Sequence, residues 1–123
     1  MLANRPGFSG FSATDIAAEK AFYADTLGVD VTEEEGMLSL HLAGGQNVII
    51  YPKEDHQPAT FTVLNFQVED IDATVDAMIA AGVTFERYDG FSQDERGTQR
   101  EEVPPIAWFK DPAGNILSVI QTD

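Results

Sequence analysis

Apolar residues recur with the period of an α-helix in two stretches of this chain, one in each half. The first stretch predicts a helix over residues 15–27, with Ile16, Lys20, Tyr23 and Leu27 on one face and Phe22 beside them. The second predicts a helix over residues 70–81, with Ile71, Val75, Met78 and Ile79 on one face. Thr14 or Asp15 can cap the first helix, Glu69 or Asp70 can cap the second, and Gly28 and Gly82 follow their ends. The helical pattern therefore repeats at an offset of about 55 residues.

Alternation of apolar and polar residues predicts short strands around each helix. In the first half the strands are expected at residues 8–13, 29–32, 37–42 and 48–51, with a charged turn over 33–36. In the second half they are expected at residues 60–68, 83–88, 106–110 and 115–121, with a long polar loop over 91–105. Within residues 37–42, Leu38, Leu40 and Leu42 face one way, whereas Met37, Ser39 and His41 face the other.

The order of elements is thus βαβββ, twice, within a single domain of 123 residues. We expect an α+β fold with one module at about residues 7–53, a polar linker at 54–59 and a second module at about 60–121. One such module leaves a sheet face without a partner. Two modules are therefore expected to form a curved mixed sheet around a cavity, with the helices on its outer face.

A tight turn joins the last two predicted strands, at Asp111-Pro112-Ala113-Gly114-Asn115. Proline restricts φ, and an Asp side chain at this place can accept hydrogen bonds from nearby backbone amides. Gly114 and Asn115 tolerate positive φ. The flanking runs are rich in β-branched and aromatic residues, which favours an antiparallel hairpin.

Three stretches, in this order, resemble motifs of the vicinal oxygen chelate superfamily, which contains glyoxalases, bleomycin resistance proteins and extradiol dioxygenases. Residues 21–28 resemble its F-Y-x-x-x-L-G helix end, and residues 66–72 resemble its F-x-V-x-D-I-D strand-to-helix entry. Residues 108–115 resemble its F-x-x-D-P-D-G-N turn, with Trp108 in place of the Phe and Ala113 in place of the second acid. The resemblance covers almost the whole chain and implies the paired βαβββ fold of that family.

Catalytic members of that family hold a divalent metal with one His or Glu from each of four cavity strands. The resemblance places three of these ligand positions at Phe8, Val63 and Ser118, and the fourth within residues 48–51. Phe8 and Val63 have no ligating atom, Ser118 is a poor ligand, and no residue of 48–51 is His, Asp or Glu. We therefore expect no metal and no other cofactor, and no metal-dependent chemistry of the family's kind.

The two histidines could in principle build a different metal site. His41 shares a strand face with Ser39, and a hydrogen-bonded wall residue is the favoured interpretation over a metal ligand. His56 lies in the linker beside Glu54 and Asp55, and a solvated loop residue is favoured there.

Residues on the same strand faces as the lost ligand positions predict a largely apolar pocket with a few polar groups. The wider set of candidate lining residues is Phe61, Asn65 and Gln67, then Ile116, Ser118 and Ile120, then Gly10 and Ser12, together with His41 and either Ile50 or Tyr51. The candidate ligand-binding residues are Asn65, Gln67, His41, Tyr51, Ser118 and Trp108.

Asn65 is the sharpest of these candidates, because an Asn at the centre of a strand is disfavoured unless its amide has partners. Bonding to the neighbouring backbone is the alternative to ligand binding. Trp108 and Lys110 share a face that alternation alone does not identify, so Trp108 is either core or a ligand platform. Residues 88–91 form either a plain turn or a lid.

The composition limits the classes of partner and the chemistry that are expected for this protein. The chain has 21 acidic and 7 basic residues, a net charge of −14, which disfavours nucleic acid and anionic membranes. It has no Cys, which excludes disulfides and thiolate chemistry, and no apolar run long enough to span a membrane. We expect a cytoplasmic protein, and the resemblance implies a homodimer.

Two functions follow from these expectations and remain open. The first is a glyoxalase- or bleomycin-resistance-like protein that binds a small organic molecule in its cavity without a metal. The alternative is an enzyme of the lyase, isomerase or dioxygenase type that uses no metal or a metal at other positions, such as His41. The sequence does not identify the ligand or decide whether the protein is catalytic.

Overall fold

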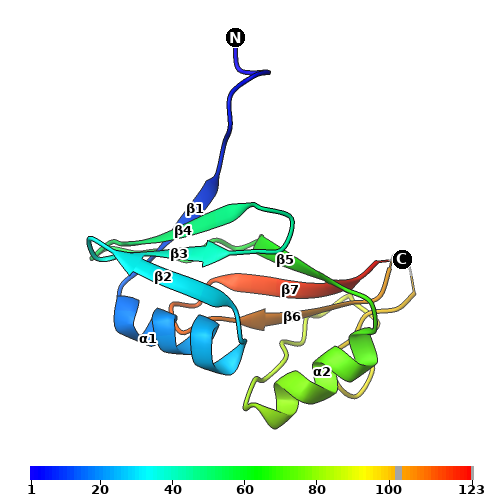
Figure 1. Cartoon of the computed structure of the whole chain (residues 1–123). Coiled ribbons are helices and arrows are strands. Elements are labelled where there is room, and N and C mark those ends of the chain that lie inside the picture. The colour runs from blue at the N-terminus through cyan, green and yellow to red at the C-terminus, as the bar shows by residue number, and fades with distance from the viewer. Residues whose placement is uncertain (102–103, 123) are drawn as a thin grey trace. The chain divides into compact units, whose positions relative to one another are not determined.

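The computed structural model describes residues 1–101 and 104–122, and the chain divides into two compact units, Met1–His56 and Gln57–Asp123 (Figure 1). Each unit contains a mixed β-sheet with a helix against one face, which confirms the predicted α+β class. None of the helices among the described residues has both the length and the apolar character needed to cross a membrane.

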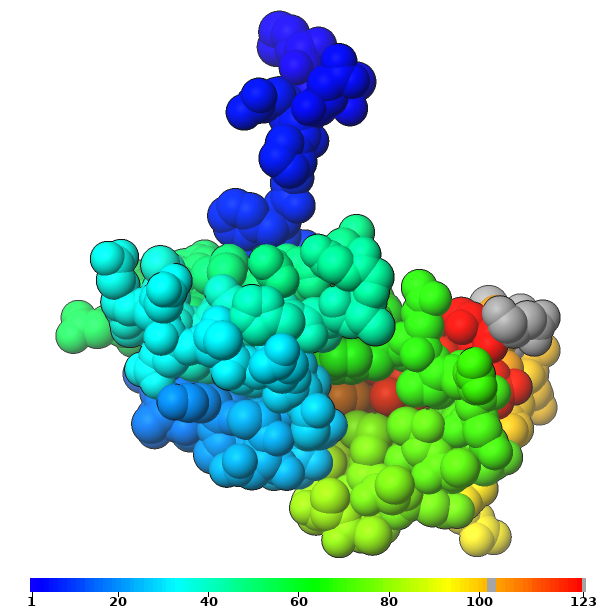
Figure 2. All heavy atoms as spheres, viewed as in Figure 1, coloured from blue at the N-terminus to red at the C-terminus, as the bar shows by residue number. Residues whose placement is uncertain are grey.

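The first unit has a sheet with the strand order β1-β4-β3-β2, in which β1 runs parallel to β4 and the other pairs are antiparallel. Its elements are β1 (Ser9–Ala13), α1 (Ile16–Lys20), the π-helix η1 (Ala21–Thr26), β2 (Asp30–Glu34), β3 (Met37–His41) and β4 (Asn47–Pro52). Helix α1 packs on β3 and β4, where Leu38, Leu40 and Ile50 are fully buried. The residues before β1 extend away from this sheet (Figure 2). Leu2 and Phe8 in this segment are exposed.

The first helix differs from its prediction in two ways. Asp15 caps it as expected, accepting a hydrogen bond from the Ala18 backbone nitrogen at 3.1 Å. Its second half is π-helical rather than α-helical, and Leu27 donates to the Phe22 carbonyl oxygen at 2.9 Å. The buried face carries Glu19 and Tyr23 instead of Lys20. Lys20 follows Glu19 by one residue, about 100° around the helix, and this rotation turns it to solvent.

The turn between β2 and β3 is shorter than predicted. Glu33 and Glu34 belong to β2, and only Glu35 and Gly36 form the turn, with φ of 55° and 80°. Positive φ at both central residues is typical of the two-residue hairpin turn that matches strand twist. The predicted four-residue charged turn is therefore wrong, and the alternating pattern of β2 runs further toward the tip.

The second unit has a sheet with the order β5-β7-β6, in which β5 is parallel and β6 antiparallel to β7. Its elements are β5 (Thr62–Val68), α2 (Ile71–Ala80), β6 (Ile106–Lys110) and β7 (Ile116–Gln121). Asp70 caps α2 by accepting from the Ala73 backbone nitrogen at 3.1 Å. Ile71 and Val75 are fully buried, but Ile79, predicted on the same face, lies in the last turn of α2 and is 44% exposed.

The strand predicted over residues 83–88 does not form within the described part of the chain. Phe85 makes only an isolated bridge with Phe109, and the Glu86 nitrogen donates to the Trp108 carbonyl oxygen at 2.8 Å. The Gln93 side chain replaces further strand pairing, because its Oε1 accepts from the Tyr88 nitrogen at 2.8 Å and its Nε2 donates to the Glu86 carbonyl oxygen at 2.9 Å. The second module is therefore βαββ with this bridged segment in place of its second strand.

Candidate ligand-binding site

The face of the second sheet opposite α2 brings several predicted site residues into one row. In the strand register, Asn65 on β5 lies opposite Ser118 on β7, and Ser118 lies opposite Trp108 on β6. The neighbouring positions Phe109, Leu117 and Val119 point to the other face, where they are buried in the core. Trp108 and Lys110 therefore share the face of Ser118 and Asn65, which resolves the orientation that the sequence left open.

Asn65 and Ser118 form a hydrogen-bonded pair in this row. The Ser118 hydroxyl donates to the Asn65 Oδ1 at 2.5 Å. Ser118 is fully buried, whereas Asn65 is exposed. The pair thus explains how an Asn is accommodated at the centre of β5, and it does not use the donor capacity of the Asn65 amide nitrogen. Gln67, two residues along β5, lies on the same face and is also exposed.

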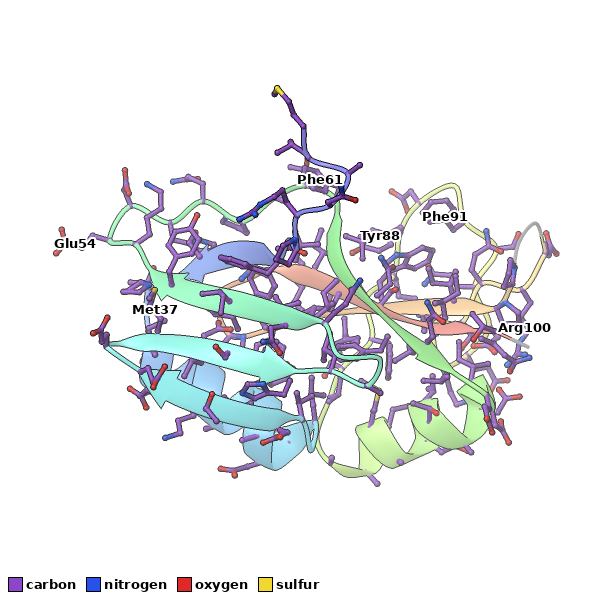
Figure 3. The ribbon with its side chains drawn as sticks, turned by 45° about the horizontal axis from the view of Figure 1, so that its top comes forward. Met37, Glu54, Phe61, Tyr88, Phe91 and Arg100 are labelled. Carbon is purple, nitrogen blue, oxygen red and sulfur yellow. The ribbon has the colours of Figure 1, made fainter. Side chains whose placement is uncertain are left out.

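Three aromatic rings, those of Trp108, Phe91 and Tyr88, meet at the Trp108 end of the row. Figure 3 labels Tyr88 and Phe91. The rings of Trp108 and Phe91 are stacked, with their centroids 5.2 Å apart and their planes at 17°. Tyr88 stands edge-on to both rings, 5.5 Å from Trp108 and 6.2 Å from Phe91. Residues 88–91 are therefore more than a plain turn, because their two aromatic side chains cover part of Trp108. Only the aromatic residues on either side of Asp89-Gly90 hint at this contact in the sequence.

Tyr88 adds an unusual polar group to this cluster. Its hydroxyl oxygen is buried and has no hydrogen-bond partner among the described residues. Burial raises the pKa of Tyr88, and the nearby Glu86 carboxylate raises it further. Tyr88 is therefore a neutral phenol at physiological pH, with a hydroxyl that can still accept or donate a hydrogen bond.

The face of the first sheet opposite α1 has a different character. His41 is bonded through Nε2 to the Thr32 hydroxyl at 2.8 Å and through Nδ1 to the Asn47 Oδ1 at 3.1 Å. These bonds fit the interpretation of His41 as a hydrogen-bonded strand residue. Tyr51 lies on this face and is 41% exposed, whereas Ile50 is fully buried on the helix side. Of the two residues considered from β4, Tyr51 is therefore the one that shares a face with His41.

His56 is not the solvated loop residue that the sequence predicted. Its ring is half-buried, and its Nδ1 lies 2.6 Å from the hydroxyl of Ser12 on β1. Ser12 pairs in register with Tyr51 and faces the same side of the sheet. The linker therefore folds back so that His56 meets the first strand, a contact between residues 44 apart that local composition does not indicate.

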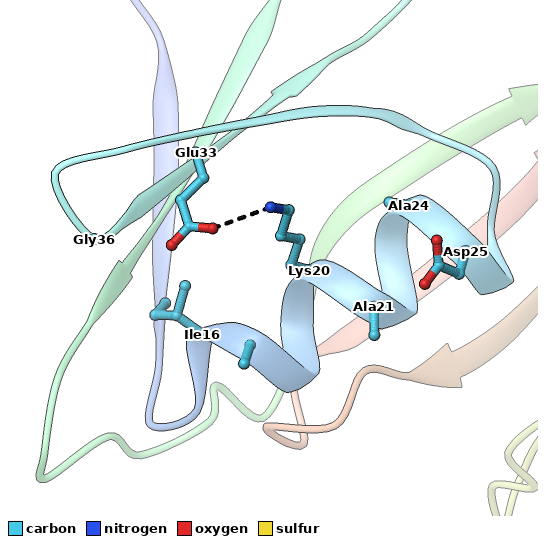
Figure 4. Close-up of a pocket in the computed structure, with 8 residues that line it drawn as sticks. Ile16, Lys20, Ala21, Ala24, Asp25, Glu33 and Gly36 are labelled. Carbon is cyan, nitrogen blue, oxygen red and sulfur yellow. Dashed lines mark hydrogen bonds and ion pairs between the residues drawn. The ribbon is translucent and has the colours of Figure 1, made fainter.

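A groove of about 450 Å³ lies between α1 and the β2–β3 hairpin (Figure 4). An ion pair between Lys20 and Glu33, 3.2 Å apart, spans it. The alanines of α1 and η1 leave it hollow, and its lining residues are Ile16, Ala17, Lys20, Ala21, Ala24, Asp25, Glu33 and Gly36. None of the predicted site residues belongs to this groove.

Comparison with known proteins identifies the family. The model of the Glyoxalase/Bleomycin resistance protein/Dioxygenase superfamily matches residues 9–119. The chain belongs to this superfamily. No curated protein sequence matches it significantly.

Solved structures show that the glyoxalase fold extends over the full chain. A glyoxalase family protein from Bacillus anthracis matches with a TM-score of 0.76 at 18% identity, with 100% of both chains covered. The antibiotic binding protein TnmS3 from a Streptomyces species matches with a TM-score of 0.68 at 19% identity, covering 98% of both chains. Lactoylglutathione lyase from Agrobacterium tumefaciens matches with a TM-score of 0.66 at 18% identity, covering 95% of this chain and 93% of that one. At these identities the likeness concerns the fold.

The residues that the resemblance places at the superfamily's metal-ligand positions do not fit a divalent cation. Phe8 precedes β1 and is 75% exposed, and Val63 offers only an aliphatic side chain. The Ser118 hydroxyl is engaged with Asn65. Among the described residues, no three His, Asp or Glu side chains come together as a metal site. The donor chemistry that Lewis-acid catalysis by a bound metal requires is therefore missing at these positions.

Proposed function

We propose that this member of the superfamily binds a small organic molecule without a metal, on the face of the second sheet opposite α2. The observation that carries the proposal is the row Asn65–Ser118–Trp108. It sets a hydrogen-bonding amide and a large aromatic ring on one face, at the place where catalytic relatives would have a metal ligand. A predominantly apolar surface with a few placed polar groups is the usual composition of a small-molecule site.

One relative supports the binding part of this proposal. One protein with the same fold is an antibiotic binding protein, so the fold serves as a binding module as well as an enzyme scaffold. The side chains at the ligand positions favour the first use here. Gln67 on the same face, and His41 and Tyr51 on the first sheet, remain secondary candidates for ligand contact.

The test combines metal analysis with ligand screening. Protein purified without chelators should contain no stoichiometric Ni, Zn, Mn or Fe, and adding these ions should leave its melting temperature unchanged. A chemically diverse set of small metabolites and antibiotics should contain compounds that raise the melting temperature, because a ligand of the native state stabilises it by mass action. Stoichiometric metal bound through the second sheet would contradict the proposal.

An enzyme remains the second candidate, and one observation favours it. The Ser12 hydroxyl and the His56 imidazole are 2.6 Å apart, the distance at which a histidine can act as a base toward a hydroxyl. Any turnover by the lyase, isomerase or dioxygenase type should then be lost in Ser12→Ala and His56→Gln. A screening hit that binds equally well to both variants and is recovered unchanged favours the binding function.

We also propose that the protein is a cytoplasmic homodimer. Each sheet, taken by itself, ends in edge strands, and strand edges in natural proteins are generally covered. The net charge of −14 opposes association through long-range repulsion that salt screens. Size-exclusion chromatography with light scattering should therefore show a dimer that strengthens with salt, and a monomer at low and high salt would contradict it.

A further inference from the structure

The ring of Trp108 is covered on one side by Phe91 of the same chain. We propose that Phe91 is an internal substitute for a planar aromatic ligand, which takes the place of Phe91 on the Trp108 ring. This inference rests on the proposed function and specifies the class of compound that the site accepts.

The geometry of the three rings carries this inference. Phe91 lies nearly parallel to Trp108, at 17°, whereas Tyr88 is nearly perpendicular to both, at 78° and 86°. Together Trp108 and Tyr88 form a corner with one flat face and one edge-on wall. Offset stacking and edge-to-face contact are the two arrangements that aromatic rings prefer. The corner therefore fits the outline of a planar ring, and Phe91 currently provides that ring.

Phe91 is weakly held compared with the rest of its loop. It is 48% exposed, and its backbone nitrogen makes only a long hydrogen bond of 3.4 Å to the Tyr88 carbonyl oxygen. Gly90, which precedes it, has a φ of 89°. A glycine in this region imposes little steric barrier on a change of loop conformation. The segment 89–91 can thus move away without unfolding the sheet that carries Trp108.

The base of the loop is fixed on both sides of this tip. Gln93 bonds to the Tyr88 nitrogen and to the carbonyl oxygens of Glu86 and Gly97, at 2.8, 2.9 and 2.8 Å. Beyond it, Arg96 is paired with Asp72 of α2 at 2.9 Å and also with Asp76, and Arg100 is paired with Asp72 and Asp94 (Figure 3 labels Arg100). Displacement of Phe91 therefore leaves Tyr88 in place as the wall of the site.

The charges around Trp108 narrow the ligand further. The Glu86 backbone nitrogen donates a hydrogen bond to the Trp108 carbonyl oxygen. The Glu86 carboxylate lies 3.6 Å from the Lys110 ammonium group. This pair is close to neutral, so the charge of the whole protein, −14, sets the long-range preference. Neutral or cationic planar compounds are therefore favoured over anionic ones, and the Trp108 face adds cation–π attraction for a cation.

Three probes and three variants test this inference. The probes are proflavine, a planar aromatic cation; naphthalene sulfonate, a planar anion; and cyclohexylamine, a saturated cation. The variants are Phe91→Ala, Trp108→Leu, and the control Ile79→Ala, which removes an apolar side chain of similar exposure, 44%, from α2. Trp108 is the only Trp in the chain, so its fluorescence reports on this site alone.

We expect proflavine to bind the natural protein, and Phe91→Ala to bind it about two- to ten-fold more tightly, because an aromatic pair that competes with the ligand has been removed. Without any ligand, Phe91→Ala should shift Trp108 emission to the red and make it more accessible to acrylamide. Trp108→Leu should abolish proflavine binding, and Ile79→Ala should leave it unchanged. Naphthalene sulfonate should bind more weakly than proflavine, and cyclohexylamine should not bind.

The opposite result for Phe91→Ala overturns the inference. Proflavine binding that weakens in this variant would make Phe91 a fixed wall of the site, and binding unaffected by Trp108→Leu would place the ligand elsewhere. If neither proflavine nor naphthalene sulfonate binds the natural protein or Phe91→Ala, the inference of a planar aromatic ligand is overturned. The proposed function then survives only if another compound of the diverse screen raises the melting temperature, so the two failures are distinguishable. The emission of Trp108 in folded Phe91→Ala keeps the test decisive even if Trp108→Leu does not fold.

Discussion

The last hairpin of each unit closes with the same backbone hydrogen bonds, but different side chains support it. In the first unit the Leu42 backbone nitrogen donates to the Gln46 carbonyl oxygen, and the Gly45 backbone nitrogen donates to the Leu42 carbonyl oxygen. In the second unit the Asp111 backbone nitrogen donates to the Asn115 carbonyl oxygen, and the Gly114 backbone nitrogen donates to the Asp111 carbonyl oxygen, with the same spacing along the chain. The first loop has two glycines in the left-handed region, whereas the second adds a buried carboxylate, that of Asp111. One copy of the repeat therefore depends on backbone conformation and the other on side-chain hydrogen bonds.

The sheet faces opposite the two helices differ in a related way. The first carries His41 between two exposed partners, Thr32 and Asn47, which water can also satisfy. The second carries a fully buried Ser118 bonded to Asn65, next to the stacked rings of Trp108 and Phe91. Buried polar groups cost free energy when they lose a partner, whereas exposed ones do not. The stability of the second unit should therefore be the more sensitive to the loss of a hydrogen-bond partner.

The largest effect is expected for Asp111→Ala. The carboxylate accepts from the backbone nitrogens of Ala113 and Asn115 at 3.0 and 2.9 Å, and from the Asn115 side-chain amide at 3.0 Å. Its loss should lower the free energy of unfolding by about 3 kcal/mol, because several donors near a buried site lose a charged acceptor. Chemical denaturation measures this change.

Gly45→Ala is the matched change in the first unit. Gly45 has a φ of 83°, and an added Cβ meets no atom within 4 Å, so only backbone strain of about 1–2 kcal/mol should appear. A loss in Asp111→Ala no greater than that in Gly45→Ala would remove the proposed contrast between the two hairpins.

Asn65→Ala should have the next largest effect. It leaves the buried Ser118 hydroxyl without its acceptor and should destabilise the protein by about 1–2 kcal/mol. Adding Ser118→Ala should recover part of this loss, since the double variant has no unpaired hydroxyl. A double-mutant cycle in denaturant measures the coupling, and strictly additive losses would show that the two side chains act independently.

His41→Phe should cost less, within about 0.5 kcal/mol, although it removes two hydrogen bonds. Both partners are exposed and can bond to water instead. Thermal melting with and without Zn should give the same shift for the natural protein and the variant. A Zn-dependent stabilisation lost in His41→Phe would instead identify His41 as a metal ligand.

Elements with local signals were predictable from the sequence. The strand 106–110 appears where predicted, and Asp70, one of the two predicted candidates, caps α2. The turn at Asp111 uses its carboxylate as expected. These features depend on residues within a few positions of each other. The row Asn65–Ser118–Trp108 could be predicted only in part. Alternation identifies the residues on one face of a strand, but it does not show which strands lie side by side.

The predictions that were wrong, or that the sequence could not make, concern contacts between groups that are distant in the sequence. Residues 83–88 have a strand-like pattern, yet Gln93 takes the hydrogen-bonding positions that a neighbouring strand would use. The buried position of Glu19 depends on how α1 rotates against its sheet, which the apolar pattern placed one residue away. Phe91 reaches Trp108 because a loop folds back over the sheet, and no periodicity encodes that contact.

The smallest effect is expected from acid titration of Asp94, which holds the loop of the second unit. Burial disfavours ionisation of this carboxyl, but the Thr98 and Arg96 backbone nitrogens and the Arg100 guanidinium outweigh it and lower the pKa of Asp94. A carboxyl with a lowered pKa stabilises the fold above its ordinary value of about 3.9, and this contribution is lost as the pH falls through the lowered value. Because the chain has 21 acidic residues, the comparison must be with Asp94→Asn, which keeps an acceptor but never ionises. Near neutral pH the natural protein should be the more stable by less than about 1 kcal/mol, and melting curves should show this gap closing below about pH 4. A gap that stays constant down to low pH would mean that ionised Asp94 does not stabilise the loop, and that the loop base is held by Gln93 and α2 alone.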